Sequence, residues 1–142
     1  MKKVNKKAYY NYFVLEDFVA GIMLQSSEVK SLSKGDFNFE SSFIIFKDNE
    51  LFIKDMRISP YKNASYNNHQ EVRDRKLLLK KKEINKISKE IDQKGITIMP
   101  LEVFELNKKF KVKIGICRGR KNYDKRELIK KRDLERESGR KF

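Results

Sequence analysis

The side chains best suited to do chemistry in this chain are cationic and aromatic, and they are concentrated near its end. Residues 118–142 include 11 basic and 5 acidic side chains, a net charge of +6. Tyr123 lies among them, directly before Asp124, Lys125 and Arg126. Basic side chains neutralise phosphates, and a tyrosine ring stacks on a nucleobase at about 1–3 kcal/mol per contact. The segment therefore predicts binding to RNA, and a solvated basic tail without a single role is the alternative.

Two further basic clusters lie beside aromatic or apolar runs. Lys6 and Lys7 precede three tyrosines, and Arg75 and Lys76 lie where a basic loop enters an apolar stretch. If a helix begins there, its N-terminal amides would add affinity for anions. Ordinary core packing is the alternative for the tyrosines, and an ordinary loop with an amphipathic helix start is the alternative for the second cluster. All four basic residues are included among the candidate RNA contacts.

Catalytic chemistry finds little support in the sequence. His69 is the only histidine and Cys117 the only cysteine, so neither an internal disulfide nor a Cys/His zinc site can form. Gly119 stands alone, which excludes a glycine loop that cradles phosphates. We expect no enzyme activity, no cofactor and no metal, with a basic nuclease as the less favoured alternative. Cys117 fits a small buried hydrophobic residue in a reducing cytoplasm.

The whole chain is basic, with a net charge of +14 and 38% charged residues. Charge of this sign implies a polyanionic partner and says nothing about fold. A membrane is the weaker choice, because no apolar run approaches the roughly 20 residues that a span needs. The length of 142 residues predicts one main domain. We expect the protein to bind RNA as a monomer and to take no small-molecule substrate.

Aromatic-rich, apolar and alternating stretches predict five or six strands. The expected strands are residues 9–15 continued in one bent strand through 21–24, 43–46, 51–53, and two strands joined around 107–109. Pro100 marks an edge or a bulge in the first of this last pair. In its second strand Lys111 and Lys113 alternate with apolar residues, which gives one basic and one apolar face.

Two helices are expected between these strands. Residues 27–35 predict a short helix with a serine cap and a glycine stop. Residues 77–93 predict the main helix, because Leu77, Ile84, Ile87 and Ile91 recur at heptad-like spacing before Gly95. Residues 59–74 lack periodicity and predict a loop.

The predicted fold is mainly β, a small antiparallel OB-like barrel with flanking helices, in residues 1–118. An SH3-like barrel or an α+β sandwich has a similar strand count. Residues 119–142 form a basic tail that is disordered or weakly helical when free. Asp124 and Glu127 encode a capping box there, which contributes little against the ordering entropy of the following helix.

These residues resemble the SsrA-binding protein family, also named small protein B or SmpB, the bacterial partner of transfer-messenger RNA. The matching segments run through almost the whole chain: Asn5-Lys6-Lys7-Ala8, Tyr12-Phe13, Ala20-Gly21, Glu28-Val29-Lys30-Ser31-Leu32, Ile58-Ser59-Pro60, Arg75-Lys76-Leu77-Leu78-Leu79, Gly119-Arg120-Lys121 and Tyr123-Asp124-Lys125-Arg126. The resemblance implies a non-enzymatic protein that delivers transfer-messenger RNA to stalled ribosomes for trans-translation. The tail then enters the empty mRNA channel and the decoding centre, against small-subunit rRNA. A general single-strand-binding or architectural protein is the alternative from another class.

The resemblance also implies site residues. Those expected to face transfer-messenger RNA are Leu78, Lys80, Lys111, Lys113 and Arg118, to which the basic clusters add Lys6, Lys7, Arg75 and Lys76. Those expected to meet the ribosome are Arg120, Lys121, Tyr123, Asp124, Lys125, Arg126, Ile129, Lys130 and Arg132. Three positions depart from residues found in many or some members: Val19 replaces glutamate, Tyr123 histidine and Lys80 asparagine.

Overall fold

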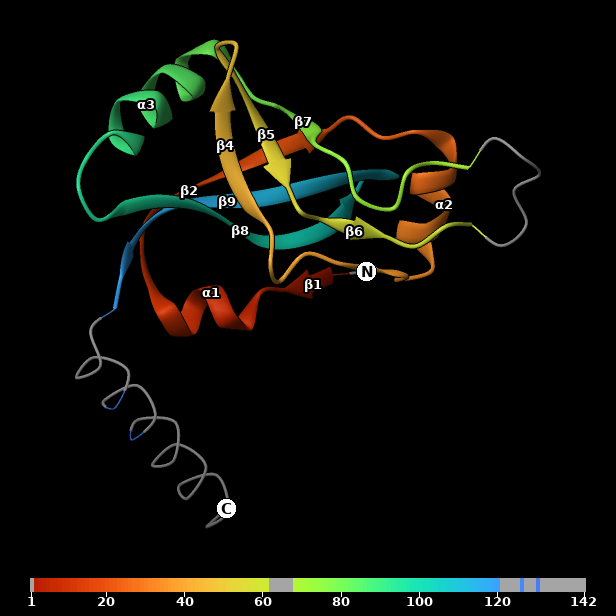
Figure 1. Ribbon diagram of the computed structural model, residues 1–142, viewed down its shortest axis with the longest axis horizontal. Coiled ribbons are helices and arrows are strands. Elements are labelled where there is room, and N and C mark those ends of the chain that lie inside the picture. Colours follow the sequence, from red (N-terminus) through yellow and green to blue (C-terminus); the bar gives the residue numbers. More distant parts are fainter. Residues whose placement is uncertain (1, 62–67, 121–125, 127–129, 131–142) are drawn as a thin grey trace.

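The computed structural model describes residues 2–61, 68–120, 126 and 130 (Figure 1). A curved antiparallel sheet dominates the described part. In chain order its strands are β1 (Lys2–Val4), β2 (Tyr12–Ile22), β4 (Phe43–Lys47), β5 (Glu50–Lys54), β7 (Arg75–Leu78), β8 (Ile96–Leu106) and β9 (Lys109–Gly119). Two short strands, β3 (Phe37–Asn38) and β6 (Arg57–Ile58), pair separately, and the helices are α1 (Lys6–Asn11), α2 (Ser26–Ser33) and α3 (Lys81–Ile91).

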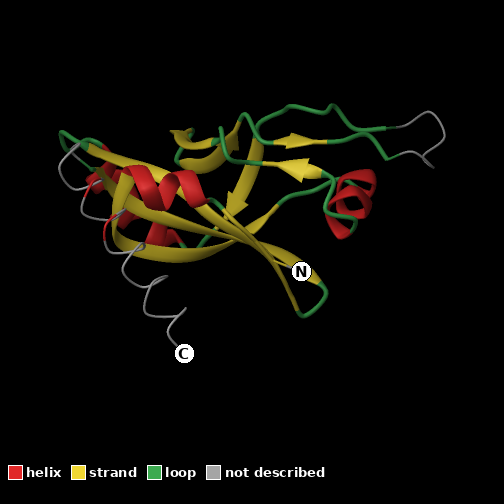
Figure 2. Ribbon diagram, turned by 90° about the horizontal axis from the view of Figure 1, so that it is seen from below, coloured by secondary structure: helices red, strands yellow, loops and turns green. Residues whose placement is uncertain are grey.

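The sheet has the strand order β1-β8-β9-β2-β7-β5-β4. Cα atoms of β4 and β8 approach within 8 Å although these two strands are not hydrogen-bonded neighbours. The sheet therefore curls into an open barrel, and Figure 2 shows how strongly its long strands twist. This confirms the mainly β, OB-like class. The strand count was too low because the very short strands carry almost no periodic signal.

The first strand begins later than the sequence predicts. Residues 9–11 belong to α1, and the extended run starts at Tyr12. The Asn5 side chain explains the helix, because its oxygen accepts the Ala8 amide at 3.1 Å. Prediction of a strand over residues 9–11 was therefore wrong. The continuation through residue 22 was correct, and the bend is a bulge between Val14 and Glu16.

The two internal helices were predicted with different success. Helix α2 is confirmed, but its first turn is capped by Glu28, whose carboxylate accepts the Gln25 amide at 2.8 Å. Gly35 follows it with φ of 76°. Helix α3 starts at Lys81, so the prediction of helix over residues 77–80 was wrong. Leu77 is fully buried in the preceding strand, β7. A single apolar residue fits both the helical and the strand periodicity, so the sequence pattern did not separate the two.

Both predicted hairpins are present. The β4–β5 turn contains Asp48 and Asn49, with φ of 53° and 60°, and the β8–β9 turn contains Asn107 and Lys108, with φ of 51° and 64°. Consecutive left-handed residues match the right-handed twist of the flanking strands. Pro100 lies at the predicted bulge, where the register of β8 against β9 shifts.

Apolar residues fill the sheet on both sides, but unequally. The large cluster inside the barrel includes Leu77, Ile98 and Val112, and α3 contributes Ile87 to it. A small cluster outside the sheet consists of Ala8, Leu101 and Cys117, which lie under α1. Gly115 leaves room for this packing, because a Cβ at this position would lie 2.7 Å from Cδ1 of Leu101 and would make that side chain shift. Within the described ranges no helix combines the length and apolar character needed to cross a bilayer.

Cys117 provides a test of the small cluster. Burial raises the pKa of its thiol from 9.0 to about 11. Because the thiolate is the nucleophile, we expect alkylation of the native protein near pH 8 to be at least about a hundredfold slower than in denaturant. Mass spectrometry of the iodoacetamide adduct over time measures both rates. Equal rates would mean that α1 does not cover this side of the sheet.

Candidate nucleic-acid interface

Two of the predicted RNA contacts meet on the outer surface of the sheet. Gly21 in β2 pairs with Lys111 in β9 on one side and with Leu78 in β7 on the other. The three residues therefore form one rung across three strands. Glycine matters at the centre, because a Cβ on Gly21 would lie 3.2 Å from the Cβ of Leu78. The exposed Leu78 side chain can thus approach β2 closely.

A groove of about 290 Å³ follows this rung. Its lining includes Lys111 and Leu78, together with Lys108 and Lys109 from the β8–β9 turn and Val29 from α2. Three lysines around an apolar floor suit a phosphate backbone with bases or sugars beneath it. Sequence reasoning missed Lys108 and Lys109 as groove-lining residues, since they were used only as turn markers.

Lys113 lies two residues further along the same face, but in a different electrostatic setting. Its Nζ is 3.6 Å from an Asp17 carboxylate oxygen, and Asp17, with a smaller contribution from Glu102, raises the pKa of Lys113. Its register partner on β2 is the exposed Val19. By contrast, none of the described carboxylates forms an ion pair with Lys111. The positive charge of this face is therefore carried chiefly by Lys111 and the turn lysines.

The basic stretch before α3 divides into exposed and buried residues. Lys76 lies in β7 with its Nζ 3.7 Å from a Glu50 oxygen. Lys80 is exposed at the start of α3, where its backbone amide donates to a Glu83 carboxylate oxygen at 3.1 Å. Both ammonium groups remain accessible beside Leu78.

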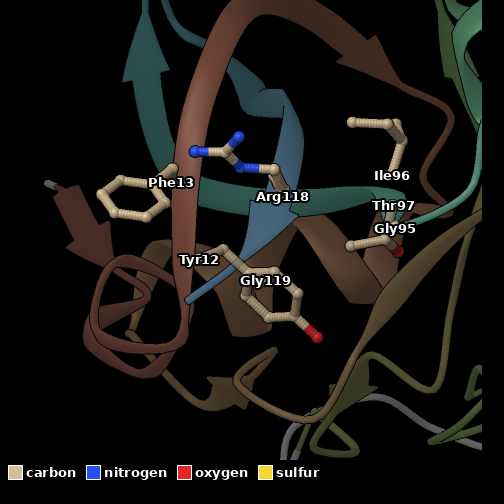
Figure 3. A pocket seen from close by; sticks show the side chains of 7 residues that line it. All are labelled: Tyr12, Phe13, Gly95, Ile96, Thr97, Arg118 and Gly119. Carbon is tan, nitrogen blue, oxygen red and sulfur yellow. The ribbon is translucent and has the colours of Figure 1, made fainter. Parts of the chain in front are cut away.

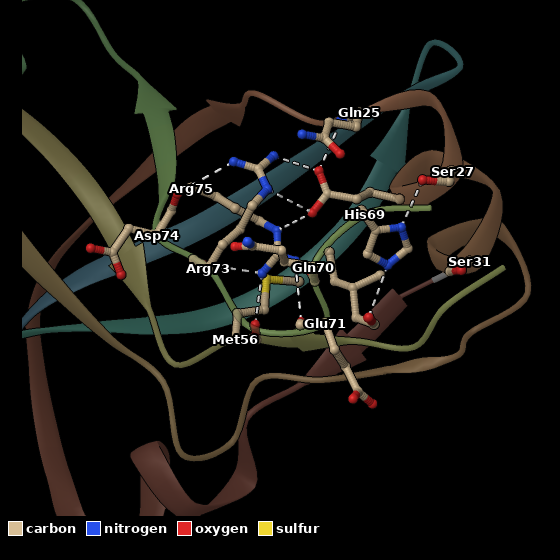
Figure 4. A network of polar contacts seen from close by, with 12 residues as sticks. Gln25, Ser27, Ser31, Met56, His69, Gln70, Glu71, Arg73, Asp74 and Arg75 are labelled. Carbon is tan, nitrogen blue, oxygen red and sulfur yellow. Dashed lines mark hydrogen bonds and ion pairs between the residues drawn. The ribbon is translucent and has the colours of Figure 1, made fainter. Parts of the chain in front are cut away.

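Arg75 is the exception among the predicted contacts. Its side chain has no exposed surface, and its guanidinium donates to Glu28 and to the Met56 carbonyl at 2.7 Å (Figure 4). The expectation that Arg75 contacts RNA directly does not fit this position. Its guanidinium forms an ion pair inside the protein with Glu28, which joins β7 to α2.

Glu28 is the centre of this buried network. Its carboxylate accepts Arg75 Nε and Arg73 Nη2, each at 2.5 Å, from a fully buried position. Burial alone would raise the pKa of Glu28, but the hydrogen bonds from Arg73, the Gln25 amide and Arg75 lower it below its usual value. Beside it the His69 ring bridges Ser27 Oγ at 2.7 Å and the Ile58 carbonyl at 2.9 Å. His69 is thus a structural residue.

Arg118 is at the opposite end of β9 from Lys111, so the structure separates these two predicted RNA contacts. Arg118 lines an open depression of about 730 Å³ together with Tyr12, Phe13 and Thr97 (Figure 3). Its guanidinium carbon lies 5.3 Å from the centre of the Phe13 ring, and that of Arg120 lies 3.9 Å from it. Both distances are in the range of cation–π contacts.

The remaining predicted residues fall into three groups. Lys6 and Lys7 are exposed on α1, which packs against β8 over the sheet surface between the groove and the depression. Arg126 and Lys130 are described as exposed, with helical backbone. The others lie outside the described residues: Lys121, Tyr123, Asp124, Lys125, Ile129 and Arg132. The capping box and the tail helix also lie outside them.

Comparisons with known proteins agree over nearly the whole chain. The family model described as SmpB protein matches residues 2–142. The SsrA-binding protein of Persephonella marina is 46% identical over 138 residues, which is 97% of this chain and 91% of the relative. That of Wolbachia pipientis wMel is 47% identical over 137 residues, covering 96% and 92%. A solved structure of SmpB, described with tmRNA and the bacterial ribosome, has a TM-score of 0.69 at 38% identity and covers 90% of this chain and 94% of that one.

The Glu28 network predicts a large effect on stability. Glu28→Gln should lower the free energy of unfolding by about 3–5 kcal/mol at neutral pH, because Arg75 would stay buried without a full counter-charge. The folded pKa of Glu28 is below 4.5, so its contribution is complete above pH 4.5 and disappears as the pH falls through the folded pKa. Urea unfolding at pH 7 and near pH 3 measures both effects.

The matched control is Glu71→Gln, which breaks a surface pair with Arg57 and should cost at most about 1 kcal/mol. Equal effects of the two substitutions on the free energy of unfolding would contradict the role of Glu28 as the buried counter-charge of Arg75.

Proposed function

This chain belongs to the SmpB protein family, and on that premise we propose that it is an RNA-binding ribosome-rescue factor. It binds the tRNA-like domain of transfer-messenger RNA and delivers that RNA to stalled ribosomes for trans-translation. The observation that carries the proposal is the family match, which extends through the basic tail to residue 142. The neighbouring solved structure, described with tmRNA and the ribosome, supports the same partners.

The groove and its surroundings form the surface proposed to hold transfer-messenger RNA. Lys111 supplies a charge that no carboxylate of the described residues pairs with, Leu78 an apolar contact, and Lys108 and Lys109 further cations at the edge. Lysine side chains around an apolar strip can hold a backbone and pack against exposed bases or sugars at once. Lys80 extends this surface beyond the end of β7.

We further propose that the chain divides near Gly119. The sheet ends there, at the last residue of β9, and Arg120 still contacts the barrel. Residues 121–142 would then act on the ribosome, in the empty mRNA channel and the decoding centre. This division needs no catalytic group, which agrees with membership of an RNA-binding family. A protein that acts on the bacterial ribosome works in the cytoplasm.

Salt dependence tests the RNA-binding surface. If the barrel neutralises about five phosphates, the logarithm of the affinity for the tRNA-like domain should fall against the logarithm of salt with a slope of roughly −4. Lys111→Ala should reduce the steepness by about one unit. Lys113→Ala should reduce it less, because Asp17 already pairs with this lysine. Filter binding at several potassium chloride concentrations gives the slopes.

The control for that experiment is Lys47→Ala, an exposed lysine on the β4–β5 hairpin away from the groove. Its slope should equal that of the unchanged protein. An unstructured RNA of equal length is the second control, since a general single-strand-binding protein would bind it equally well. Equal slopes for all three variants would rule out the groove as the binding surface.

Removal of residues 124–142 tests the division of labour. None of these residues belongs to the described core, so folding and affinity for the tRNA-like domain should change less than about threefold. Peptide tagging on ribosomes stalled without a stop codon should nevertheless fall to background, because the mRNA channel stays empty. Affinity and tagging are measured on the same preparations. A parallel loss of RNA affinity would refute the division.

A further inference from the structure

The chain is held at the point where it leaves the barrel. The Arg120 amide donates to the Asn11 carbonyl at 2.7 Å, beyond the last residue of β9. The Arg120 Nε donates to the carbonyls of Tyr9 and Tyr12, at 3.3 and 3.2 Å. All three acceptors lie at the C-terminal end of α1, which Figure 1 shows beside the end of β9. A cation suits the free carbonyls and the dipole at this end of a helix.

The second contact of Arg120 is the ring of Phe13. The guanidinium carbon lies 3.9 Å from the ring centre, closer than that of Arg118 at 5.3 Å. Phe13 is partly exposed, so it does not belong to the buried clusters of the barrel. Its ring instead contacts a residue that is 107 positions later in the chain.

Helix α1 is itself fixed to the sheet, so these contacts have a firm base. The Asn5 amide donates to the Leu101 carbonyl at 2.8 Å, and its side-chain amide donates to the Pro100 carbonyl at 3.0 Å. Ala8 packs against Leu101 and Cys117 beneath the helix. Hydrogen bonds and packing therefore link β8 to α1, and α1 to Arg120.

We propose that Phe13 is a positioning residue that holds Arg120 against the end of α1 and so fixes where the tail begins. This inference rests on the proposed ribosomal function. When the barrel is bound, entry of the tail into the mRNA channel is an intramolecular step, whose effective concentration depends on the position and direction of its start. A fixed start raises that concentration. Arg120 then acts on α1 and Phe13, rather than on ribosomal RNA as the family resemblance implies.

The test compares Phe13→Leu with Phe13→Tyr. Leucine keeps apolar bulk but removes the ring, whereas tyrosine keeps the ring. In Phe13→Leu the Arg120 amide should exchange about two- to fivefold faster, and tagging should fall by a similar factor. Affinity for the tRNA-like domain should fall less than tagging, because Arg118, 5.3 Å from the ring centre, keeps its charge when the ring is removed. Phe13→Tyr should restore both amide protection and tagging, which a role in filling space alone does not predict.

Phe46→Leu is the matched control, because it removes an exposed phenylalanine ring on the β4 hairpin, far from Arg120 in the fold. It should leave amide exchange and tagging unchanged. Thermal unfolding of all variants establishes that each is folded. Normal tagging by Phe13→Leu would overturn the proposal, as would a loss of RNA affinity that parallels the loss of tagging. Failure of the unchanged protein to tag would instead refute the proposed function, while the exchange measurement would still test the contact.

The chain has no tryptophan, so Phe13→Trp adds a single fluorescent reporter. An indole ring is the strongest cation–π partner among the aromatic residues, and this variant should keep full tagging. Arg120→Met in the same background should shift the emission and raise the amide exchange at residue 120. Emission that does not respond to Arg120→Met would show that the ring and the guanidinium are not in contact.

Discussion

The buried ion pair between Glu28 and Arg75 is the constraint on which the functional surface depends. It joins α2 to β7, and Arg75 also donates to the Met56 carbonyl just before β6. Two charges can be buried only when hydrogen bonds satisfy them fully, so this arrangement tolerates very few alternative positions of β7. The strand β7 is short, and the ion pair acts together with its pairing to β2 and β5 and with the burial of Leu77 to fix its place. The position of Leu78 beside Gly21, and hence the groove, follows from the pair.

The same strand, β9, connects the two functional regions. Lys111 and Lys113 lie near its beginning on the outer face, and Arg118 lies at its end with Phe13. The stretch between Lys113 and Arg118 spans about 17 Å at the usual rise of a strand. Helix α1 lies on the sheet within this stretch, over the small cluster around Cys117. RNA binding and the start of the tail are thus separate in space but attached to one rigid element.

The sequence predicted the parts of this fold that have a clear period or a strong turn signal. The strands of the β8–β9 hairpin alternate, the β4–β5 hairpin is two apolar runs around a polar turn, and Pro100 could only mark a bulge or an edge. Leu77 could not be placed, because a single leucine fits a helix and a strand equally well, and its pairing with Ile22 of β2 is a long-range contact. Lysines at 111 and 80 were foreseen on the surface, whereas Arg75 was not recognised as buried. Its partner Glu28 is 47 residues away, beyond any local pattern.

The long β8–β9 hairpin has a mechanical consequence. Strand β9 is flanked on both sides, by β8 and by β2, with antiparallel pairing along almost its whole length. Tension applied at residue 120 would act along this strand, so the hydrogen bonds on both sides would resist together in shear instead of opening one after another. Resistance to such a force depends on the rate of unfolding rather than on equilibrium stability. A protein tethered through its last strand can therefore be pulled from that end while its barrel keeps its shape.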